Sequence, residues 1–108
     1  MRVVDITEIN FEEEVLEYNG IAIVKFYGSW CGPCKMLASV LEEMDEYDNL
    51  KVVGLDVDKN MTLAKQFGVM SVPTLLVFKD GAEVDKVVGF RSKSQLDEMF
   101  TNYVNSGK

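Results

Sequence analysis

Histidine is absent from this chain of 108 residues. Without it the chain can form neither a Cys/His catalytic pair nor a zinc site with histidine ligands, and no histidine can shuttle a proton. Basic residues are also few, since 11 Lys and Arg stand against 18 Asp and Glu and give a formal charge of −7. Because this charge repels phosphate backbones and anionic lipids, we expect no nucleic acid and no membrane among the partners.

A long hydrophobic run is also missing. Apolar stretches such as 21–24 and 74–78 fall far short of the roughly 20 residues that span a bilayer. The first residues reach Asp5 before any such run, so they do not resemble a signal peptide. We therefore expect a cytoplasmic protein. Its length suits a single domain, residues 1–108, with a buried core.

Only two cysteines occur, Cys31 and Cys34, and they form one C-x-x-C motif. In a reducing compartment such a pair indicates redox chemistry or metal binding rather than a disulfide framework. Zinc takes four ligands, and the chain has no second cysteine pair and no histidine to complete a site. Half of a zinc site stays as a minor alternative, and we expect no metal and no cofactor beyond the dithiol itself.

The hydrophobic pattern predicts strands that alternate with helices. We expect strands at 21–27, 51–57, 74–78 and 83–88, and helices at 10–18, after the cysteines, at 60–67 and from Ser92. Capping boxes are predicted at Asn10 with Glu13 and at Ser92 with Gln95, and Asp80-Gly81 indicates a hairpin. The order β-α-β-α-β-α-β-β-α predicts an α/β fold, a mixed sheet covered by helices on both faces.

The cysteines fall where a strand gives way to a helix. Apolar residues at helical spacing follow them, namely Leu37, Val40, Leu41 and Met44. At a helix N-terminus, unpaired N–H groups and the macrodipole stabilise a thiolate, so Cys31 is the expected nucleophile and Cys34 the buried resolving thiol. Pro33 suits the first turn and fixes the spacing of the two sulfurs, while Gly32 lets a partner's backbone approach.

The segment Trp30-Cys31-Gly32-Pro33-Cys34-Lys35 resembles the active-site motif of the thioredoxin family, and the resemblance extends over essentially the whole chain. It implies a thioredoxin fold, with a central mixed five-stranded sheet flanked by four helices. It also implies a protein-disulfide reductase in which Cys31 attacks a substrate disulfide and Cys34 resolves the mixed disulfide. The implied partners of this monomer are disulfide-containing client proteins and a thioredoxin reductase that recycles the oxidised pair.

The resemblance implies a substrate surface as well. Ser71-Val72-Pro73-Thr74 resembles the family's loop in which a cis-proline faces the redox pair, and Gly89-Phe90 resembles its last substrate-contacting turn. We expect Pro73 to be cis on this ground alone, because few X-Pro bonds are cis. An extended substrate segment would pair with backbone near Val72, on a surface made of Trp30, Gly32, Pro33, Val72, Pro73, Gly89 and Phe90. The alternative for Trp30 and Phe90 is an ordinary place in the core.

Lys25 departs from the family pattern. Thioredoxins usually carry a buried acid on the central strand, six positions before the first cysteine, paired with a lysine on the neighbouring strand, and this chain has Lys25 and Gly54 at those places. Lys25 is therefore a candidate catalytic residue that either stabilises thiolates as a cation or accepts a proton from Cys34. The alternative is a lysine that extends to solvent. A second departure is Ser39, which replaces a helix-kinking proline and is expected to bond back to a carbonyl.

Other function classes stay open on sequence alone. A non-catalytic binding module could use the fold as a scaffold, although the chain retains both cysteines. An oxidase or isomerase of an exporting pathway needs a signal peptide and usually a different pair of residues between the cysteines. A glutaredoxin is a weaker alternative, because the chain lacks that family's usual Pro-aromatic dipeptide between the cysteines.

Overall fold

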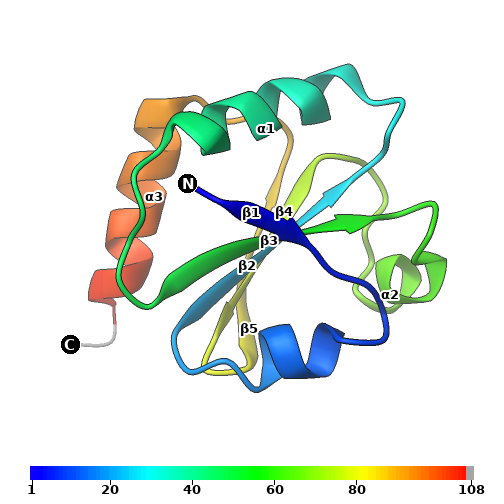
Figure 1. The fold of residues 1–108 in the computed structure, drawn as a ribbon, viewed down its shortest axis with the longest axis horizontal. Coiled ribbons are helices and arrows are strands. Elements are labelled where there is room, and N and C mark those ends of the chain that lie inside the picture. The colour runs from blue at the N-terminus through cyan, green and yellow to red at the C-terminus, as the bar shows by residue number, and fades with distance from the viewer. Residues whose placement is uncertain (107–108) are drawn as a thin grey trace.

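The computed structural model describes residues 1–106, and its strands form one mixed sheet (Figure 1). The strand order is β1-β3-β2-β4-β5, with β1 (Val3–Asp5), β2 (Ile21–Tyr27), β3 (Leu50–Asp56), β4 (Thr74–Lys79) and β5 (Ala82–Val88). Strands β1 and β2 run parallel to β3, whereas β4 is antiparallel to both β2 and β5. The predicted five-stranded mixed sheet is confirmed, and β2 is its central strand.

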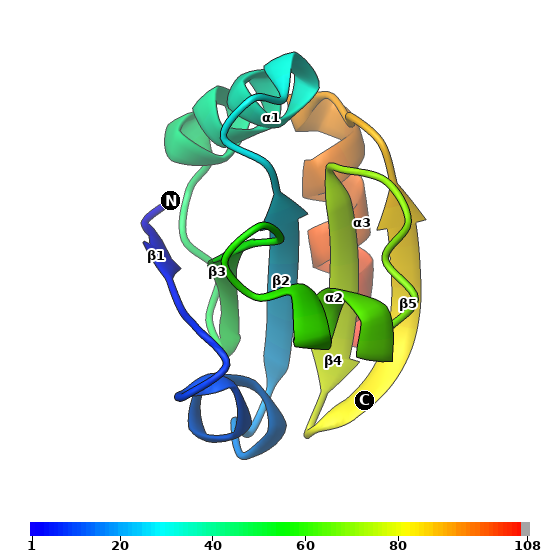
Figure 2. The same ribbon diagram turned by 90° about the vertical axis from the view of Figure 1, so that its right-hand side faces the viewer.

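Two helices cover each face of this sheet. The π-helix η1 (Glu12–Leu16) and α2 (Met61–Gln66) pack on one face, and α1 (Gly32–Glu43) and α3 (Lys93–Asn105) pack on the other. Figure 2 shows α2 in front of the strands and α3 behind them. The four expected helices are thus present, and the sheet separates two apolar cores.

The central strand contributes alternate residues to the two cores. Ile21 and Ile23 pack under α1 and α3, while Ala22, Val24 and Phe26 pack under η1 and α2. Because both faces are covered, the strand reads as a continuous apolar run rather than an alternating one. Lys25 is the one charged residue in the strand, on the face that α1 and α3 cover.

The first helix differs from its prediction. It is a π-helix of five residues instead of a helix over 10–18, and no side chain caps it. The Asn10 side chain accepts a hydrogen bond from the Thr7 N–H at 2.8 Å and so closes the turn before the helix. Phe11 takes the N-cap position because its ring is buried against Phe67 and Phe78. The capping box predicted for Asn10 and Glu13 is therefore wrong.

Turn and cap predictions near the C-terminus are confirmed. Asp80 and Gly81 both have positive φ, 48° and 85°, as the tight turn of a β-hairpin requires. Ser92 accepts a hydrogen bond from the Gln95 N–H, and the Gln95 side chain accepts one from the Ser92 N–H. These reciprocal bonds fix the start of α3.

Candidate active site

The C-x-x-C motif lies at the start of α1, shortly after the end of β2. Strand β2 ends at Tyr27, and Cys31 is the N-cap residue of α1. Its Sγ accepts a hydrogen bond of 3.2 Å from the Cys34 N–H, one of the groups that the first turn of a helix leaves without a backbone partner. Cys31 and Cys34 are joined as a disulfide, with their Cα atoms 5.3 Å apart. Pro33 occupies the first turn, as predicted.

Both cysteines are buried, while the two residues between them are exposed. Cys34 is 3% exposed, as expected of a resolving thiol, and Cys31 is only 4% exposed. Cys31 Sγ lies 3.7 Å from the carbonyl oxygen of Val72. The loop that begins β4 therefore covers the first sulfur, and nothing in the local sequence around Cys31 indicated this burial.

The Val72–Pro73 peptide bond is cis, as the family resemblance implied. Pro73 is buried, and its carbonyl oxygen accepts a hydrogen bond of 2.8 Å from the Gly89 N–H. Gly89 has a φ of 95°, a conformation that favours glycine. The structure thus brings the loop before β4 and the turn after β5 together beside the redox pair.

Trp30 is an exposed aromatic residue beside Cys31. It is 68% exposed, and its Nε1–H donates a hydrogen bond of 2.9 Å to Asp58. Its ring lies over Gly28, where an added Cβ would come within 2.7 Å of it. Phe90 is half-buried and packs against the core under α1 and α3. The core alternative is therefore wrong for Trp30 and correct in part for Phe90.

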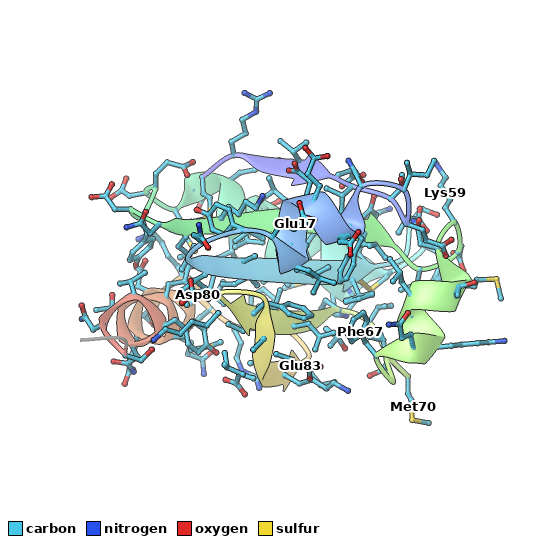
Figure 3. All side chains as sticks on the ribbon, turned by 90° about the horizontal axis from the view of Figure 1, so that it is seen from below. Glu17, Lys59, Phe67, Met70, Asp80 and Glu83 are labelled. Carbon is cyan, nitrogen blue, oxygen red and sulfur yellow. A yellow bond between two sulfur atoms is a disulfide. The ribbon has the colours of Figure 1, made fainter. Side chains whose placement is uncertain are left out.

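An apolar pocket of about 130 Å³ lies next to Trp30 and Val72. Its other lining residues are Val57, Val69, Met70 and Ser71. Met70 is 96% exposed, and Figure 3 shows its side chain projecting away from the fold. Ser71 belongs to the loop that the sequence singled out, whereas sequence reasoning did not place Val57, Val69 or Met70 in the site, although Val69 and Met70 directly precede that loop.

Lys25 lies opposite Gly54, as predicted, and is only 7% exposed. Most of its side chain is thus buried, and Lys25 lines two open pockets, so the alternative of a lysine whose end extends to solvent stays open. Its Nζ lies 5.2 Å from the centre of the Tyr27 ring. Burial lowers the pKa of Lys25 below its ordinary value, while the carboxylates of Asp5 and Glu42 oppose that change.

A pocket connects Lys25 with the second cysteine. It has a volume of about 220 Å³ and is lined by Lys25, Tyr27, Gly28, Ser29, Cys34, Lys35 and Ala38. Lys25 and Cys34 therefore face one shared space.

On α1, the hydroxyl of Ser39 donates to the carbonyl oxygen of Lys35 at 3.3 Å, the back-bond that was expected there.

Two further findings concern residues 1–106 alone. No cluster of three or more cysteine and carboxylate side chains in this range could hold a metal ion. Nor does any helix in it combine the length and the apolar character needed to cross a membrane.

Comparison with known proteins decides the family. A model of the thioredoxin family matches residues 2–102. The chain belongs to the thioredoxin family. It is 48% identical to the thioredoxin of Staphylococcus haemolyticus over 106 residues, which cover 96% of this chain and 100% of the relative. It is 46% identical to the thioredoxin of Bacillus subtilis over 106 residues, with the same coverage.

A third relative agrees with these two. The thioredoxin of Listeria monocytogenes is 47% identical over 102 residues, which cover 93% of this chain and 97% of the relative. As a thioredoxin-family protein with an intact cysteine pair, the chain is a thiol–disulfide oxidoreductase, and the disulfide between Cys31 and Cys34 is its redox-active group.

Proposed function

We propose that this thioredoxin-family protein reduces disulfide bonds in client proteins of the cytoplasm, with Cys31 as the nucleophile and Cys34 as the resolving thiol. The observation that carries these roles is the place of Cys31 at the N-cap of α1. There the Cys34 N–H and the positive end of the helix macrodipole favour a thiolate on Cys31, while Cys34 lies one turn inside the helix.

The exchange then runs in two steps. The Cys31 thiolate attacks one sulfur of a client disulfide, a bond forms between them, and the other client sulfur leaves with the electron pair. Cys34 loses its proton and attacks Cys31, the internal disulfide forms, and the second client sulfur leaves as a thiolate. The client gains two electrons, and the protein ends as the disulfide-bonded form.

The client would dock on the surface around Cys31. Among residues 1–106 the backbone N–H of Val72 has no hydrogen-bond partner, so it can pair with an extended client segment. The apolar pocket beside Trp30 would take a client side chain. The other groups proposed for this surface are Gly32, Pro33, Pro73, Gly89 and Phe90.

A thioredoxin reductase is the partner we propose for recycling, since the oxidised pair must be reduced again after each turnover. The protein would act as a monomeric single domain without a cofactor, because the cysteine pair itself carries the electrons. The cytoplasm suits this direction of electron flow, since its thiol pools keep such a pair reduced.

Disulfide reduction tests the proposal directly. The protein should accelerate insulin reduction by dithiothreitol, whereas a scaffold would add nothing to the rate of the reductant alone. Cys34→Ser should trap a mixed disulfide between Cys31 and a client, and Cys31→Ser should trap none. Trapping by Cys31→Ser instead would reverse the two roles. A reduction potential close to that of the oxidant DsbA, about −120 mV, would overturn the reducing direction.

A further inference from the structure

Lys25 belongs to a row of residues that crosses the sheet. Asp5 on β1, Gly54 on β3 and Lys25 on β2 are in register, so their positions lie side by side on one face of the sheet. This face is the one that α1 covers. Since Gly54 has no side chain, the space between Asp5 and Lys25 is left to side chains of β1 and β2, the strands on either side of β3.

The ammonium group of Lys25 has an uneven environment. Among residues 1–106 no carboxylate lies within 4.0 Å of it and no hydrogen bond holds it, while the centre of the Tyr27 ring lies 5.2 Å away. Lys25 lines the pocket that it shares with Cys34. It also lines a second pocket of about 310 Å³, together with Asp5 and Glu42.

The charged groups around these pockets differ in sign. On the Cys34 side the charged side chains are Lys25 and Lys35, and no carboxylate lines that pocket. Both acids, Asp5 from β1 and Glu42 from α1, line the second pocket together with Arg2. From β2 only the phenol of Tyr27 faces Lys25, and β4 presents the apolar Leu75 opposite it. The charged side chains that line the Cys34 pocket are therefore both lysines.

We propose that Lys25 is a positioning residue that stays protonated and stabilises the thiolate of Cys34. The carboxylates of Asp5 and Glu42 in the second pocket favour the charged form of Lys25. The inference rests on the proposed role of Cys34 as the resolving thiol. A cation near a thiol favours its ionised form, which is the form that attacks the mixed disulfide.

In the resolving step Lys25 keeps all its bonds. The Cys34 proton leaves to water in the shared pocket, the new bond forms between the sulfurs of Cys34 and Cys31, and the client sulfur departs with the electron pair of the broken bond. Asp5 and Glu42, which line the second pocket, favour the protonated form of Lys25 and act against the effect of its burial.

The test measures the pKa of the Cys34 thiol. In the Cys31→Ser background Cys34 is the only thiol, and the pH dependence of its alkylation by iodoacetamide reports its pKa. Lys25→Met should raise that pKa by about one unit, a tenfold loss of thiolate at pH values below it. Lys25→Arg should keep the parent value, because arginine stays charged and cannot act as a base.

The matched control is Lys51→Met on the neighbouring strand. Lys51 also lies over a tyrosine ring, 4.4 Å from the centre of Tyr18, but on the opposite face of the sheet, so its loss should leave Cys34 unchanged. Lys25→Gln replaces Lys25→Met if that variant does not fold. An unchanged Cys34 pKa in the neutral variants, or a shift in Lys25→Arg equal to theirs, overturns the proposal. Neither result bears on insulin reduction by the parent protein, which tests the oxidoreductase roles separately.

Discussion

The hydroxyl group of Tyr27 donates a hydrogen bond of 2.5 Å to the carboxylate of Asp5, although strand β3 lies between their strands. Gly54 is the residue of β3 that makes this possible. An added Cβ there would overlap the Asp5 carboxylate and come within 3.4 Å of the Tyr27 ring. Burial of the phenol, and then the hydrogen bond to Asp5, raise the pKa of Tyr27 well above its ordinary value.

Gly54→Ala should break this bond between Tyr27 and Asp5. We expect a loss of about 1 kcal/mol in the free energy of unfolding, the usual value of one hydrogen bond. The pKa of Tyr27 should fall part of the way toward its ordinary value, since burial remains, and NMR titration of the tyrosine rings measures it. Gly32→Ala is the control, because its added Cβ meets open space. An unaltered Tyr27 titration would contradict the account.

Some features of the fold could be predicted because they depend on local sequence. The turn of Asp80-Gly81 and the capping box of Ser92 follow from residue type and spacing. These patterns need no knowledge of distant segments. The family resemblance supplied the rest of what was right, above all the cis bond before Pro73.

Long-range contacts explain what could not be predicted. Asn10 has the spacing of an N-cap residue, but the N-cap position is taken by Phe11, whose ring is buried in the core. The contact of Cys31 with Val72 and the bond from Tyr27 to Asp5 join segments that only the folded sheet brings together. Exposure at Met70 likewise depends on how the loop before β4 leaves α2.

Ser92→Ala should weaken the start of α3. The substitution removes the oxygen that accepts the Gln95 N–H, and N-cap losses of this kind cost about 1 kcal/mol. Urea unfolding monitored by circular dichroism measures the change. Asn102→Ala, at an exposed position inside the same helix, should have no effect or a small stabilising one. Equal losses in both variants would show that the cap contributes nothing specific.

Asp97 should make stability depend on pH in the acid range. Hydrogen bonds from Lys93 at 3.1 Å and Tyr47 at 3.0 Å lower the pKa of its carboxyl. Because the folded value lies below the unfolded one, the stabilisation is complete above the unfolded pKa of about 3.9 and is lost as the pH falls through the folded pKa.

The variant Asp97→Asn tests this dependence, since it retains an acceptor for Tyr47 but has no charge for Lys93. It should be less stable than the parent at pH 7, and the two unfolding curves should converge below about pH 3. High salt should also narrow the gap at pH 7, because the pair is exposed. Glu98→Gln, at the adjacent exposed carboxylate, controls for net charge. A gap that persists at low pH would contradict the assignment.

Gly28→Ala should move the Trp30 ring while leaving the fold intact. Three ring atoms lie 2.7 to 3.0 Å from the position of the added Cβ, which is too close, and the exposed indole can swing outward at little cost. Its hydrogen bond to Asp58 would then break. Because this is the only tryptophan, its fluorescence emission reports the displacement directly.

The same substitution separates docking from sulfur chemistry. Client reduction should slow several-fold through a higher KM, since the pocket beside Trp30 loses one wall, whereas reaction of the reduced protein with a small aromatic disulfide should keep its rate. Asp58→Asn, which keeps an oxygen acceptor for the indole, should resemble the parent in both assays. Emission and KM that stay at the parent values in Gly28→Ala would mean that the indole does not form this wall during client binding.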